Sequence, residues 1–453
     1  MIYLLVDVGS TYTKLHLVDT NKNVILAGAS SYTTVETDVR EGFNKAYKKL
    51  REISDVKYDK ILGCSSASGG LKVIAIGFSK SLTTDAARLA SLSSGARILN
   101  VYSYELKDEQ VEEIKSAGAD IIVLCGGTDH GNRDNIIYNA KKLAKGSVKT
   151  PVVVAGNIDT HEEIRDIFNK ADVPCDFTEN VMPTTNTINY RPLRQTIGDL
   201  FIKTIAHAKG IDLLSKDFEI LLPTPVAVQK AMSVYAKYLD KVILSVDIGG
   251  ATTDIHSIGK TYYGEENVIS PPIDEPYEKR TVEGDMGMRY SATALYESVG
   301  DEPFLKFGIK DAKEKTEFRF NHTNYIPDND EDLFFDNVLC YIATHTSLMR
   351  HVGHIKKIKT PTRTIYEQYG KDLRPAEMFI GTGGSLINSD DPKKILSAIR
   401  DLDEKYLINR DVKCYLDKEY ILSSAGLIST VDEEASYKLF LKNYKFFRSY
   451  HFW

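Results

Sequence analysis

The sequence predicts an α/β protein that has two related lobes and, inserted in the first of them, a doubly wound α/β domain. A strand–turn–strand pattern over residues 3–18 recurs over residues 242–258, and each copy turns at an Asp-x-Gly sequence. Two β-hairpins of one design are therefore expected, one in each lobe. Between the copies, strand-like and helical stretches alternate, which is typical of βαβ units that form a parallel sheet.

The length and the composition limit the class of protein. A chain of 453 residues is too long for one core and predicts two or three domains. The net charge is -6, so the basic excess of nucleic-acid binders is missing. The first residues lack the charged region of a signal peptide, and no apolar run is long enough to span a membrane. We therefore expect a soluble cytoplasmic protein that binds neither nucleic acid nor membrane. The cysteines are scattered and predict free thiols, at Cys64, Cys125, Cys175, Cys340 and Cys414.

The first hairpin turns over the segment Asp7–Lys14, which reads Asp-Val-Gly-Ser-Thr-Tyr-Thr-Lys. Glycine lets a backbone turn tightly and approach a ligand closely. Successive backbone N–H groups and small hydroxyls then form a cradle for an anion. Asp7 ends a strand, where it could orient the waters of a Mg²⁺ ion, which takes few protein carboxylates. Alone, this segment is equally well explained as an ordinary turn.

The inserted domain is expected over residues 64–200, and its far boundary is soft. Seven segments alternate there at the spacing of a parallel α/β sheet. The predicted strands are Leu71–Phe78, Arg97–Tyr102, Asp120–Cys125 and Pro151–Ala155, and the predicted helices lie near Thr84–Ser93, Glu109–Ala117 and Asn135–Lys145. The first lobe is expected to comprise residues 1–63 and to continue over residues 201–241. Residues 242–453 are expected to form the second lobe.

The second hairpin follows a mostly helical stretch, Ile211–Tyr238, and turns over Asp247–Asp254, which reads Asp-Ile-Gly-Gly-Ala-Thr-Thr-Asp. It repeats the chemistry of the first turn with two carboxylates and two hydroxyls. Two facing hairpins of this kind could hold the β- and γ-phosphates of a nucleotide from both sides. A third segment, Met378–Leu386, is an apolar strand that enters a glycine-rich turn, against which a purine and a ribose could lie.

The three segments, in this order, resemble the phosphate-one, phosphate-two and adenosine motifs of the superfamily that contains actin, sugar kinases and heat-shock chaperones. The resemblance implies a two-lobed, actin-like ATPase fold with ribonuclease H-like lobes, and ATP and Mg²⁺ as its ligands. Leu222–Val228 and Ser423–Leu427 are similar to the two connecting helices, whose small residues let the lobes hinge. Ala251 departs from the pattern, since chaperones carry a third glycine there.

Three further segments, Gly63–Val73, Leu124–Asp129 and Thr281–Tyr290, resemble the MutL accessory-protein family of glutamate mutase, which is unrelated to the mismatch-repair proteins of that name. This resemblance runs over nearly the whole chain. It implies a reactivating chaperone that uses ATP to free an adenosylcobalamin-dependent mutase, such as glutamate mutase or an aminomutase, of damaged cobalamin. The mutase subunits are then the partners, and a homodimer is an option that the sequence leaves open.

The expected site follows from these motifs. Asp7 and Asp247 would organise Mg²⁺ and water, and Asp254 would orient the attacking water. Glu283 and Asp285 either reach Mg²⁺ or ribose, or cap a helix. The other expected nucleotide contacts are Gly9, Ser10, Thr11, Thr13, Lys14, Gly249, Gly250, Thr252, Thr253, Gly381, Gly383, Gly384 and Ser385.

Several alternatives stay open at this point. A small-molecule kinase of the same superfamily, or an ATP-binding assembly protein, would carry the same three motifs. Cys64 and Cys125 could bridge an iron–sulfur cluster between two subunits, although structural thiols are favoured. Asp129 and His130 are adjacent, which favours a turn or an interface position over cobalt ligation. His351 and His354, with His345 upstream, favour a solvated or packed helix face over a metal site.

Overall fold

The structure is a computed structural model, and it describes residues 1–34, 37–66, 71–79, 83–93, 96–185, 187–205, 210–262, 268–271, 274–361, 363–443 and 447–450. The chain forms two compact units. One unit comprises Met1–Gly69, Lys209–Pro271 and Glu275–Trp453, and the other comprises Gly70–Ala208 and Pro272–Asp274. Residues 67–70 of the predicted segment Gly63–Val73 lie outside the described residues.

The first lobe is built on a five-stranded sheet with the order β10-β4-β1-β2-β3. β1, β2 and β3 are antiparallel neighbours, whereas β4 and β10 run parallel to β1. Helix α1 (Val39–Ile53) packs on β2 and β3 and begins at Asp38, whose side chain accepts from the Arg40 N–H. The strands are β1 (Ile2–Val8), β2 (Tyr12–Asp19), β3 (Val24–Tyr32), β4 (Lys60–Ser65) and β10 (Ile220–Pro223).

The second lobe repeats this plan in a sheet with the order β14-β12-β11-β17-β18-β19. Its first three strands are antiparallel, and β17 and β18 run parallel to β11. Because order and direction match those of the first sheet, the predicted α/β fold with two related, actin-like lobes is confirmed. The strands are β11 (Val242–Ile248), β12 (Thr253–Ile258), β14 (Glu278–Glu283), β17 (Ala376–Thr382), β18 (Lys413–Asp417) and β19 (Phe447–Tyr450).

Helix α12 (Asp330–His351) is the longest helix described and lies on the second sheet. Asn329 caps it, acidic residues fill its first turn, and Arg350 and His351 fill its last, which complements the helix dipole. Phe335 and Leu339 bury its apolar face against the sheet. The smaller helices of this lobe are α9 (Ala292–Val299), α10 (Glu302–Leu305), α11 (Ala312–Asn321), α13 (Gly384–Ile387) and α14 (Pro392–Leu396).

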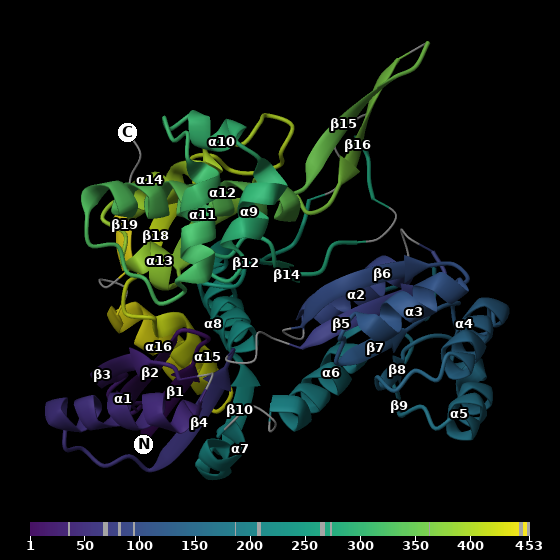
Figure 1. The fold of residues 1–453 in the computed structure, drawn as a ribbon, viewed down its shortest axis with the longest axis horizontal. Helices are drawn as coiled ribbons and strands as arrows, with labels where there is room; N and C mark the ends of the chain where they lie inside the picture. The colour runs from purple at the N-terminus through teal and green to yellow at the C-terminus, as the bar shows by residue number, and fades with distance from the viewer. Residues whose placement is uncertain are drawn as a thin grey trace. The chain divides into compact units, whose positions relative to one another are not determined.

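A β-ribbon extends from the second lobe (Figure 1). It consists of β15 (His354–Lys359) and β16 (Thr364–Tyr369), which are antiparallel, with the short strand β13 (Val268–Ile269) beside β16. Lys356, Lys357 and Lys359 of β15 are exposed. The ribbon was not predicted.

Helices α8 (Thr224–Leu239), α15 (Ile421–Ser429) and α16 (Glu433–Asn443) lie between the two sheets of this unit (Figure 1). A Cβ atom added to Gly426 of α15 would lie only 1.7 Å from the carbonyl oxygen of Ala227 in α8. The predicted close crossing of the connecting helices is therefore confirmed. Helix α16 ends at Asn443, and Phe447 begins β19.

The second unit contains a parallel sheet with the order β6-β5-β7-β8-β9. Helices α3, α4 and α5 bury one face of this sheet, while α2 and α6 pack together on the other (Figure 1). All seven predicted segments are found within one residue at each end, so the doubly wound prediction is confirmed. The elements are β5 (Lys72–Gly77), α2 (Thr83–Ser93), β6 (Arg97–Ser103), α3 (Asp108–Ser116), β7 (Ile121–Leu124), α4 (Asp134–Lys145), β8 (Val152–Val154), α5 (His161–Lys170), β9 (Cys175–Phe177) and α6 (Tyr190–Ile205), followed by α7 (Ile211–Leu214) in the first unit.

The predicted limits of the insert need correction at both ends. Residue 64 lies inside β4, where Cys64 and Ser65 pair with Asp7 and Val8 of β1. Their backbone bonds tie them to the first-lobe sheet, so the insert begins after this strand. At the other end, α6 continues to Ile205, past the predicted limit of 200, because its packing partner α2 belongs to the insert.

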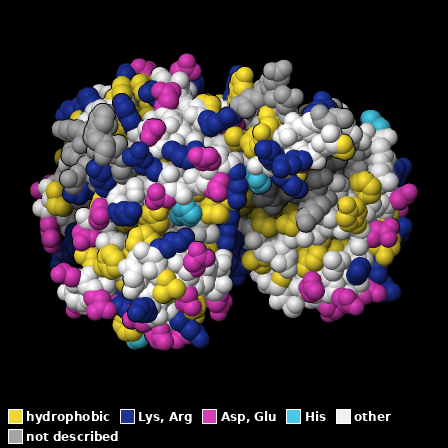
Figure 2. Space-filling view, turned by 90° about the horizontal axis from the view of Figure 1, so that it is seen from above, with side chains coloured by type: hydrophobic (Ala, Val, Ile, Leu, Met, Phe, Trp, Pro, Cys, Tyr) yellow, Lys and Arg dark blue, Asp and Glu magenta, His cyan; other side chains and the backbone are white. Residues whose placement is uncertain are grey.

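The surface carries charge of both signs. Figure 2 shows basic and acidic side chains interspersed over the face in view, without a broad basic area. In the described part of the chain, no helix has both the length and the apolar character needed to cross a membrane.

Candidate functional site

The turns of the two hairpins have the same backbone geometry. The Gly9 N–H donates to the Tyr12 carbonyl at 3.1 Å, and the Gly249 N–H donates to the Thr252 carbonyl at 2.9 Å. A Cβ atom at Gly9 would lie 2.7 Å from the Tyr12 oxygen, and one at Gly249 would lie 3.1 Å from the Thr252 oxygen. A side chain at the first glycine of each turn would crowd a carbonyl oxygen of the same turn, which explains why glycine stands there.

The two turns lie next to each other. A Cβ atom added to Gly250 would be 3.5 Å from the Thr11 hydroxyl oxygen. Within the described chain, the N–H groups of Ser10, Thr11, Gly250 and Ala251 donate to no protein acceptor. These four residues are half-exposed. Unengaged donors from two adjacent turns form a concave array that suits an anion such as a phosphate.

The segment Thr281–Tyr290 supports the second turn from its carbonyl side. The Met288 and Arg289 N–H groups donate to the carbonyls of Gly249 and Gly250 at 3.1 and 2.8 Å. The Ser291 hydroxyl donates to the Ala251 carbonyl at 2.7 Å. Because these bonds occupy the carbonyls, they fix the turn while leaving its N–H groups available.

Acidic side chains gather beside the turns. Asp7 is 4% exposed and accepts from the Thr224 hydroxyl at 2.9 Å, and Lys14 Nζ lies 3.6 Å from it. Burial lowers the pKa of Lys14, but the charges of Asp7, Tyr420 and Asp247 outweigh burial, so its pKa is raised. Burial, with repulsion from Asp254, raises the pKa of Asp247 to about 7 although Lys14 opposes the shift. The group holds excess negative charge, which a cation would relieve.

Asp254 has a buried cationic partner that the sequence did not predict. Arg280 of β14 donates to its Oδ1 through Nε at 2.8 Å and through Nη2 at 2.5 Å. Its Oδ2 accepts from the Thr252 hydroxyl at 3.2 Å. Asp254 is therefore fixed by charge-assisted bonds, whereas the sequence suggested only that it orients water. Two other predicted hydroxyls have protein partners: Thr253 donates to the Met286 carbonyl at 2.6 Å, and the buried Thr13 pairs with the Thr33 hydroxyl at 2.8 Å.

Glu283 and Asp285 both bind Arg350, at the end of α12. Nη1 of Arg350 lies 2.8 Å from Glu283 and 2.7 Å from Asp285. Neither residue caps α9, whose N-cap is Ser291, so the capping alternative is wrong. Burial raises the pKa of Glu283, although the positive charge of Arg350 acts to lower it. For Asp285 the effect of Arg350 outweighs burial, and the pKa is lowered.

The third, glycine-rich turn packs against the second hairpin. Gly383 has φ 99°, and a Cβ atom there would lie 2.4 Å from the Ile248 carbonyl oxygen and 2.8 Å from Asp247 Oδ1. A Cβ atom at Gly381 would instead meet the Leu386 side chain at 2.4 Å. At Gly384, which begins α13 with Ser385, the nearest atom would be the Tyr420 hydroxyl at 3.6 Å. The fold therefore brings all three predicted motifs together, with an open surface at Gly384.

Comparison with known proteins shows the family of the chain. A family model described as MutL protein matches residues 3–444. The chain belongs to the MutL protein family. It is 46% identical to Protein MutL of Clostridium tetanomorphum over 441 residues, which cover 94% of this chain and 96% of that protein.

Solved structures resemble this MutL family member only loosely. Component A of (R)-2-hydroxyglutaryl-CoA dehydratase from Acidaminococcus fermentans is 8% identical over 97% of each chain, with a TM-score of 0.31. The ROK hexokinase from Thermus thermophilus is 9% identical, with 98% of this chain and 100% of that chain covered and a TM-score of 0.27. The ATP-dependent caprolactamase from Pseudomonas jessenii is 12% identical, with 94% and 70% covered and a TM-score of 0.38.

Asp417 lies beside the third motif of the candidate site, and the sequence did not reveal it. It ends β18 and accepts from the N–H groups of Ile421 and Leu422 at 2.7 and 3.1 Å, which caps α15. Its Oδ2 lies 3.3 Å from the Thr382 hydroxyl of the third motif. Burial raises the pKa of Asp417 to about 6, although these N–H bonds oppose the shift. An aspartate between an apolar strand and a helix is the signal that could have revealed it.

Gln229 is a second residue that was missed. It is 1% exposed, and neither of its amide atoms has a hydrogen-bond partner in the described part of the chain. It lies on α8 between Thr224, which bonds Asp7, and Met232, which accepts from the Ser245 hydroxyl of β11 at 2.9 Å. A single glutamine in an apolar helix gives no sequence signal.

The iron–sulfur alternative does not fit this MutL chain. Cys64 and Cys125 are both 0% exposed, so neither thiol can reach a second subunit. Cys125 donates to the Ile76 and Thr83 carbonyls, and burial raises its pKa to about 12. Among the residues with described positions, no group of three or more His, Cys, Asp or Glu side chains is arranged to hold a metal ion.

The histidines have structural partners. His130 has φ 61° and pairs with Asp159 at 3.0 Å, so the predicted turn is confirmed. His351 is buried between the Thr281 and Ser257 hydroxyls, at 2.9 and 2.8 Å, which confirms a packed helix face. His354 lies in β15 and stacks on Tyr369.

Proposed function

We propose that this chain binds ATP and Mg²⁺ between its two hairpin turns and hydrolyses ATP to reactivate an adenosylcobalamin-dependent mutase. The observation that carries the nucleotide part is the pair of identical turns, which lie next to each other with unengaged N–H groups. Family membership, with the resemblance to the accessory protein of glutamate mutase, supports the mutase part.

The residues at the turns fit a polyphosphate. The N–H groups of both turns, the hydroxyls of Thr11 and Thr252 and the Lys14 ammonium would hold the phosphate oxygens. Asp7 and Asp247 would hold Mg²⁺ or its waters, since Mg²⁺ is bound by one or two carboxylates together with phosphates. Bound ATP supplies a phosphoanhydride bond whose cleavage releases free energy. The protein's task is to position and to neutralise charge.

Each polar side chain then has a specific task. Lys14, which pairs with Asp7 at 3.6 Å, gains a second anionic partner in a phosphate and frees Asp7 to orient water. Asp254, fixed by Arg280, would orient the attacking water. Gln229 is an alternative for this role, because its buried amide has both a donor and an acceptor without partners. Gly383, Gly384 and Ser385 would lie along the nucleoside.

The connecting helices would carry the effect of hydrolysis away from the site. Thr224, the first residue of α8, bonds Asp7, and Asp417 caps α15 next to the third motif. Both helices therefore begin at the nucleotide-binding residues and cross at Gly426. A change in the occupancy of the site shifts this crossing and so the closure of the lobes. The inserted domain would dock on the mutase and respond to that closure.

The test uses a mutase inactivated by cyanocobalamin and then supplied with adenosylcobalamin. Mutase activity is expected to return only with this protein, ATP and Mg²⁺, and not with the Asp247→Asn variant. Glutamate, ornithine and lysine mutases are tried in parallel to identify the client. Absence of recovery with all three, together with ATP turnover that rises with a sugar or an acid, would instead indicate a small-molecule kinase.

A further inference from the structure

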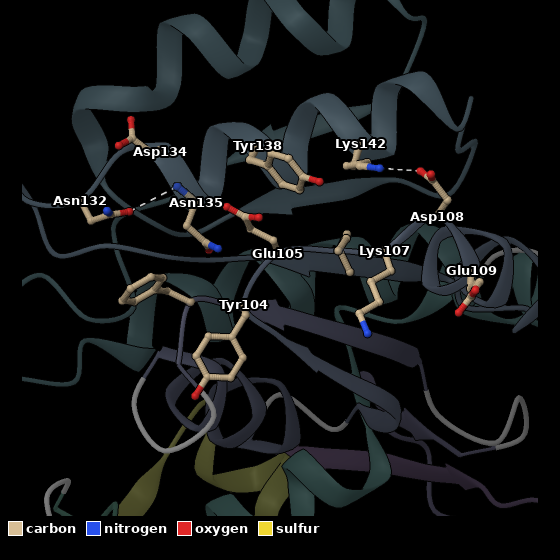
Figure 3. Close-up of a pocket in the computed structure, with 12 residues that line it drawn as sticks. Tyr104, Glu105, Lys107, Asp108, Glu109, Asn132, Asp134, Asn135, Tyr138 and Lys142 are labelled. Atoms are coloured by element: carbon tan, nitrogen blue, oxygen red, sulfur yellow. Dashed lines mark hydrogen bonds and ion pairs between the residues drawn. The ribbon is translucent and has the colours of Figure 1, made fainter.

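The inserted unit contains an open pocket of about 790 Å³ (Figure 3). It lies where β5, β6 and β7 end. In chain order the sheet reads 2-1-3-4-5, and ligands of such sheets bind beyond the carboxyl ends of the strands. The volume is that of a small-molecule site. The residues that line it are Phe78, Tyr104, Glu105, Leu106, Lys107, Asp108, Glu109, Asn132, Asp134, Asn135, Tyr138 and Lys142.

Tyr104 is held over this pocket in a strained conformation. Its φ is 70°, a region that bulky residues rarely adopt. The buried side chain of Asn139 fixes this loop, donating to the Tyr104 carbonyl at 2.9 Å and accepting from the Leu106 N–H at 2.8 Å. Yet the Tyr104 side chain is 61% exposed and buries little apolar surface. Strain held by a dedicated buried residue is typical of functional sites.

Two more aromatic rings are exposed around the same pocket. Phe78, just after β5, is 41% exposed, and Tyr138 of α4 is 36% exposed. With Tyr104, they give the pocket three aromatic lining residues, of which Tyr104 and Tyr138 are labelled in Figure 3. Exposed aromatic faces stack on flat ligands, and stacking on one ring contributes substantially to binding.

Asn135 supplies an unpartnered amide at the pocket. The residue is 6% exposed, and its Oδ1 is enclosed without a hydrogen-bond partner. Its side chain extends from the start of α4 toward the pocket, one turn before Tyr138 (Figure 3). An unpartnered buried amide oxygen costs free energy, and a rotation of the side chain toward an N–H group of a ligand would satisfy it while the amide nitrogen donates to the ligand's ring nitrogen.

The charge of the pocket disfavours a phosphate. Lys142 is neutralised by Asp108, 2.5 Å away. The other ionisable lining residues are Glu105, Glu109, Asp134 and Lys107, all exposed. Three carboxylates against one ammonium leave a negative rim, which repels anions and accepts neutral or cationic molecules.

We propose that this pocket binds a flat, nitrogen-containing heteroaromatic molecule of nucleoside size that carries no phosphate. Its ring would stack against Tyr104 and Tyr138, and its edge would hydrogen-bond to Asn135. All lining residues belong to the inserted unit, so this site is distinct from the proposed ATP site and does not depend on it.

The experiment measures adenosine binding to the full-length protein by calorimetry, with Mg²⁺ and saturating ADP present to occupy any nucleotide site. AMP is the phosphate-bearing comparison. We expect saturable adenosine binding, with AMP several-fold weaker. Tyr138→Ala and Asn135→Ala should each weaken adenosine about tenfold, as loss of a stacked ring or of a paired amide does. Tyr138→Phe keeps the ring and should bind normally.

The control is Asn169→Ala, at an exposed position of α5, which should leave binding unchanged. Glu105 is exposed in a loop, so Glu105→Lys should leave the fold intact. This substitution should raise the affinity for AMP relative to adenosine. The proposal is overturned if adenosine shows no saturable binding at millimolar concentration. It is equally overturned if AMP binds as tightly as adenosine, or if Tyr138→Ala and Asn135→Ala bind like Asn169→Ala.

Discussion

Lys14 shows how single residues prepare the proposed site. Its ammonium lies 3.6 Å from Asp7 and 3.8 Å from the centre of the Tyr420 ring, so a half-buried cation is compensated by groups from both lobes. At Asp247, close by, burial and the neighbouring carboxylates disfavour the ionised form of the side chain. A bound cation and a bound polyphosphate would correct both imbalances.

Asp7→Asn and Asp247→Asn should each lower ATP turnover by about 10²–10³-fold, as the loss of one preorganised polar group does. Asparagine keeps the shape of the side chain, so the thermal unfolding curve should change little. Phosphate release in the steady state measures the effect. Asp172→Asn serves as the matched control, since Asp172 pairs with Lys149 at the surface of the inserted unit. Parental turnover in both site variants would exclude this assignment.

The raised pKa of Asp247 predicts a pH dependence of Mg²⁺–ATP binding. Mg²⁺ requires the ionised carboxylate, whereas below a pKa of about 7 the proton competes with it. The dissociation constant should therefore rise about tenfold from pH 8 to pH 6. Asp247→Asn, which cannot ionise, should bind more weakly but lose most of this dependence. Titration by calorimetry at several pH values checks both; a flat profile in the parental protein would contradict the assignment.

A substitution at Gln229 can distinguish an effect on the stability of the fold from an effect on ATP hydrolysis. Gln229→Leu replaces two buried, unpartnered polar atoms with apolar ones of similar volume, so stability should stay equal or increase. If the amide orients water, turnover should fall about 10–100-fold with an unchanged dissociation constant for ATP. A stable variant with normal turnover would show that Gln229 has no part in hydrolysis.

At the scale of elements, helices α8 and α15 cross closely at Gly426. Gly426→Ala should destabilise the protein by about 1–3 kcal/mol, because a Cβ atom would lie 1.7 Å from the Ala227 oxygen. It should also hold the helices apart and weaken nucleotide binding. Calorimetric unfolding and ATP titration test this.

The control for this prediction is Gly198→Ala in α6, where a Cβ atom meets nothing within 4 Å. That change should stabilise its helix by up to about 1 kcal/mol. If both glycine variants behave alike, the crossing does not limit closure.

Elements with apolar periodicity were predictable, and elements stabilised by distant partners were not. The strands of the inserted sheet bury continuous apolar runs such as Ile121–Leu124, so local sequence identifies them. β14 reads Glu-Lys-Arg-Thr-Val-Glu and looks like a loop. It is a strand because Arg280 pairs with Asp254 and because its backbone bonds β12. The ion pairs of Glu283 and Asp285 with Arg350, 65 or more residues away, are equally invisible in local sequence.

At the scale of the whole molecule, the insert interrupts the connection between β4 and β10. These strands are parallel neighbours, so any connection between them must cross over the sheet. The apolar core of the insert is formed by its own residues, whereas the lobes have cores of their own. The proposed docking on a mutase and the proposed hydrolysis of ATP can therefore be tested separately.

Deleting residues 70–208 should leave ATP turnover within a few-fold of the parental rate but abolish mutase reactivation. Residues 209–219 are retained in this variant, because the crossover to β10 needs them. Circular dichroism and ATP turnover establish that the lobes fold before reactivation is measured. Full reactivation by the deletion variant would leave the insert without its proposed docking role.

The β15–β16 ribbon has a consequence for how the protein behaves at high concentration. β15 is the outer strand, and beyond Ile355 no described segment pairs with its free edge. An open strand edge is a template on which a second chain can polymerise. Lys356, Lys357 and Lys359 place positive charge along this edge, so a second copy adding there would bring like charges together. The lysines thus act as gatekeepers, and replacing them with threonines should make the ribbon a nucleus for aggregation.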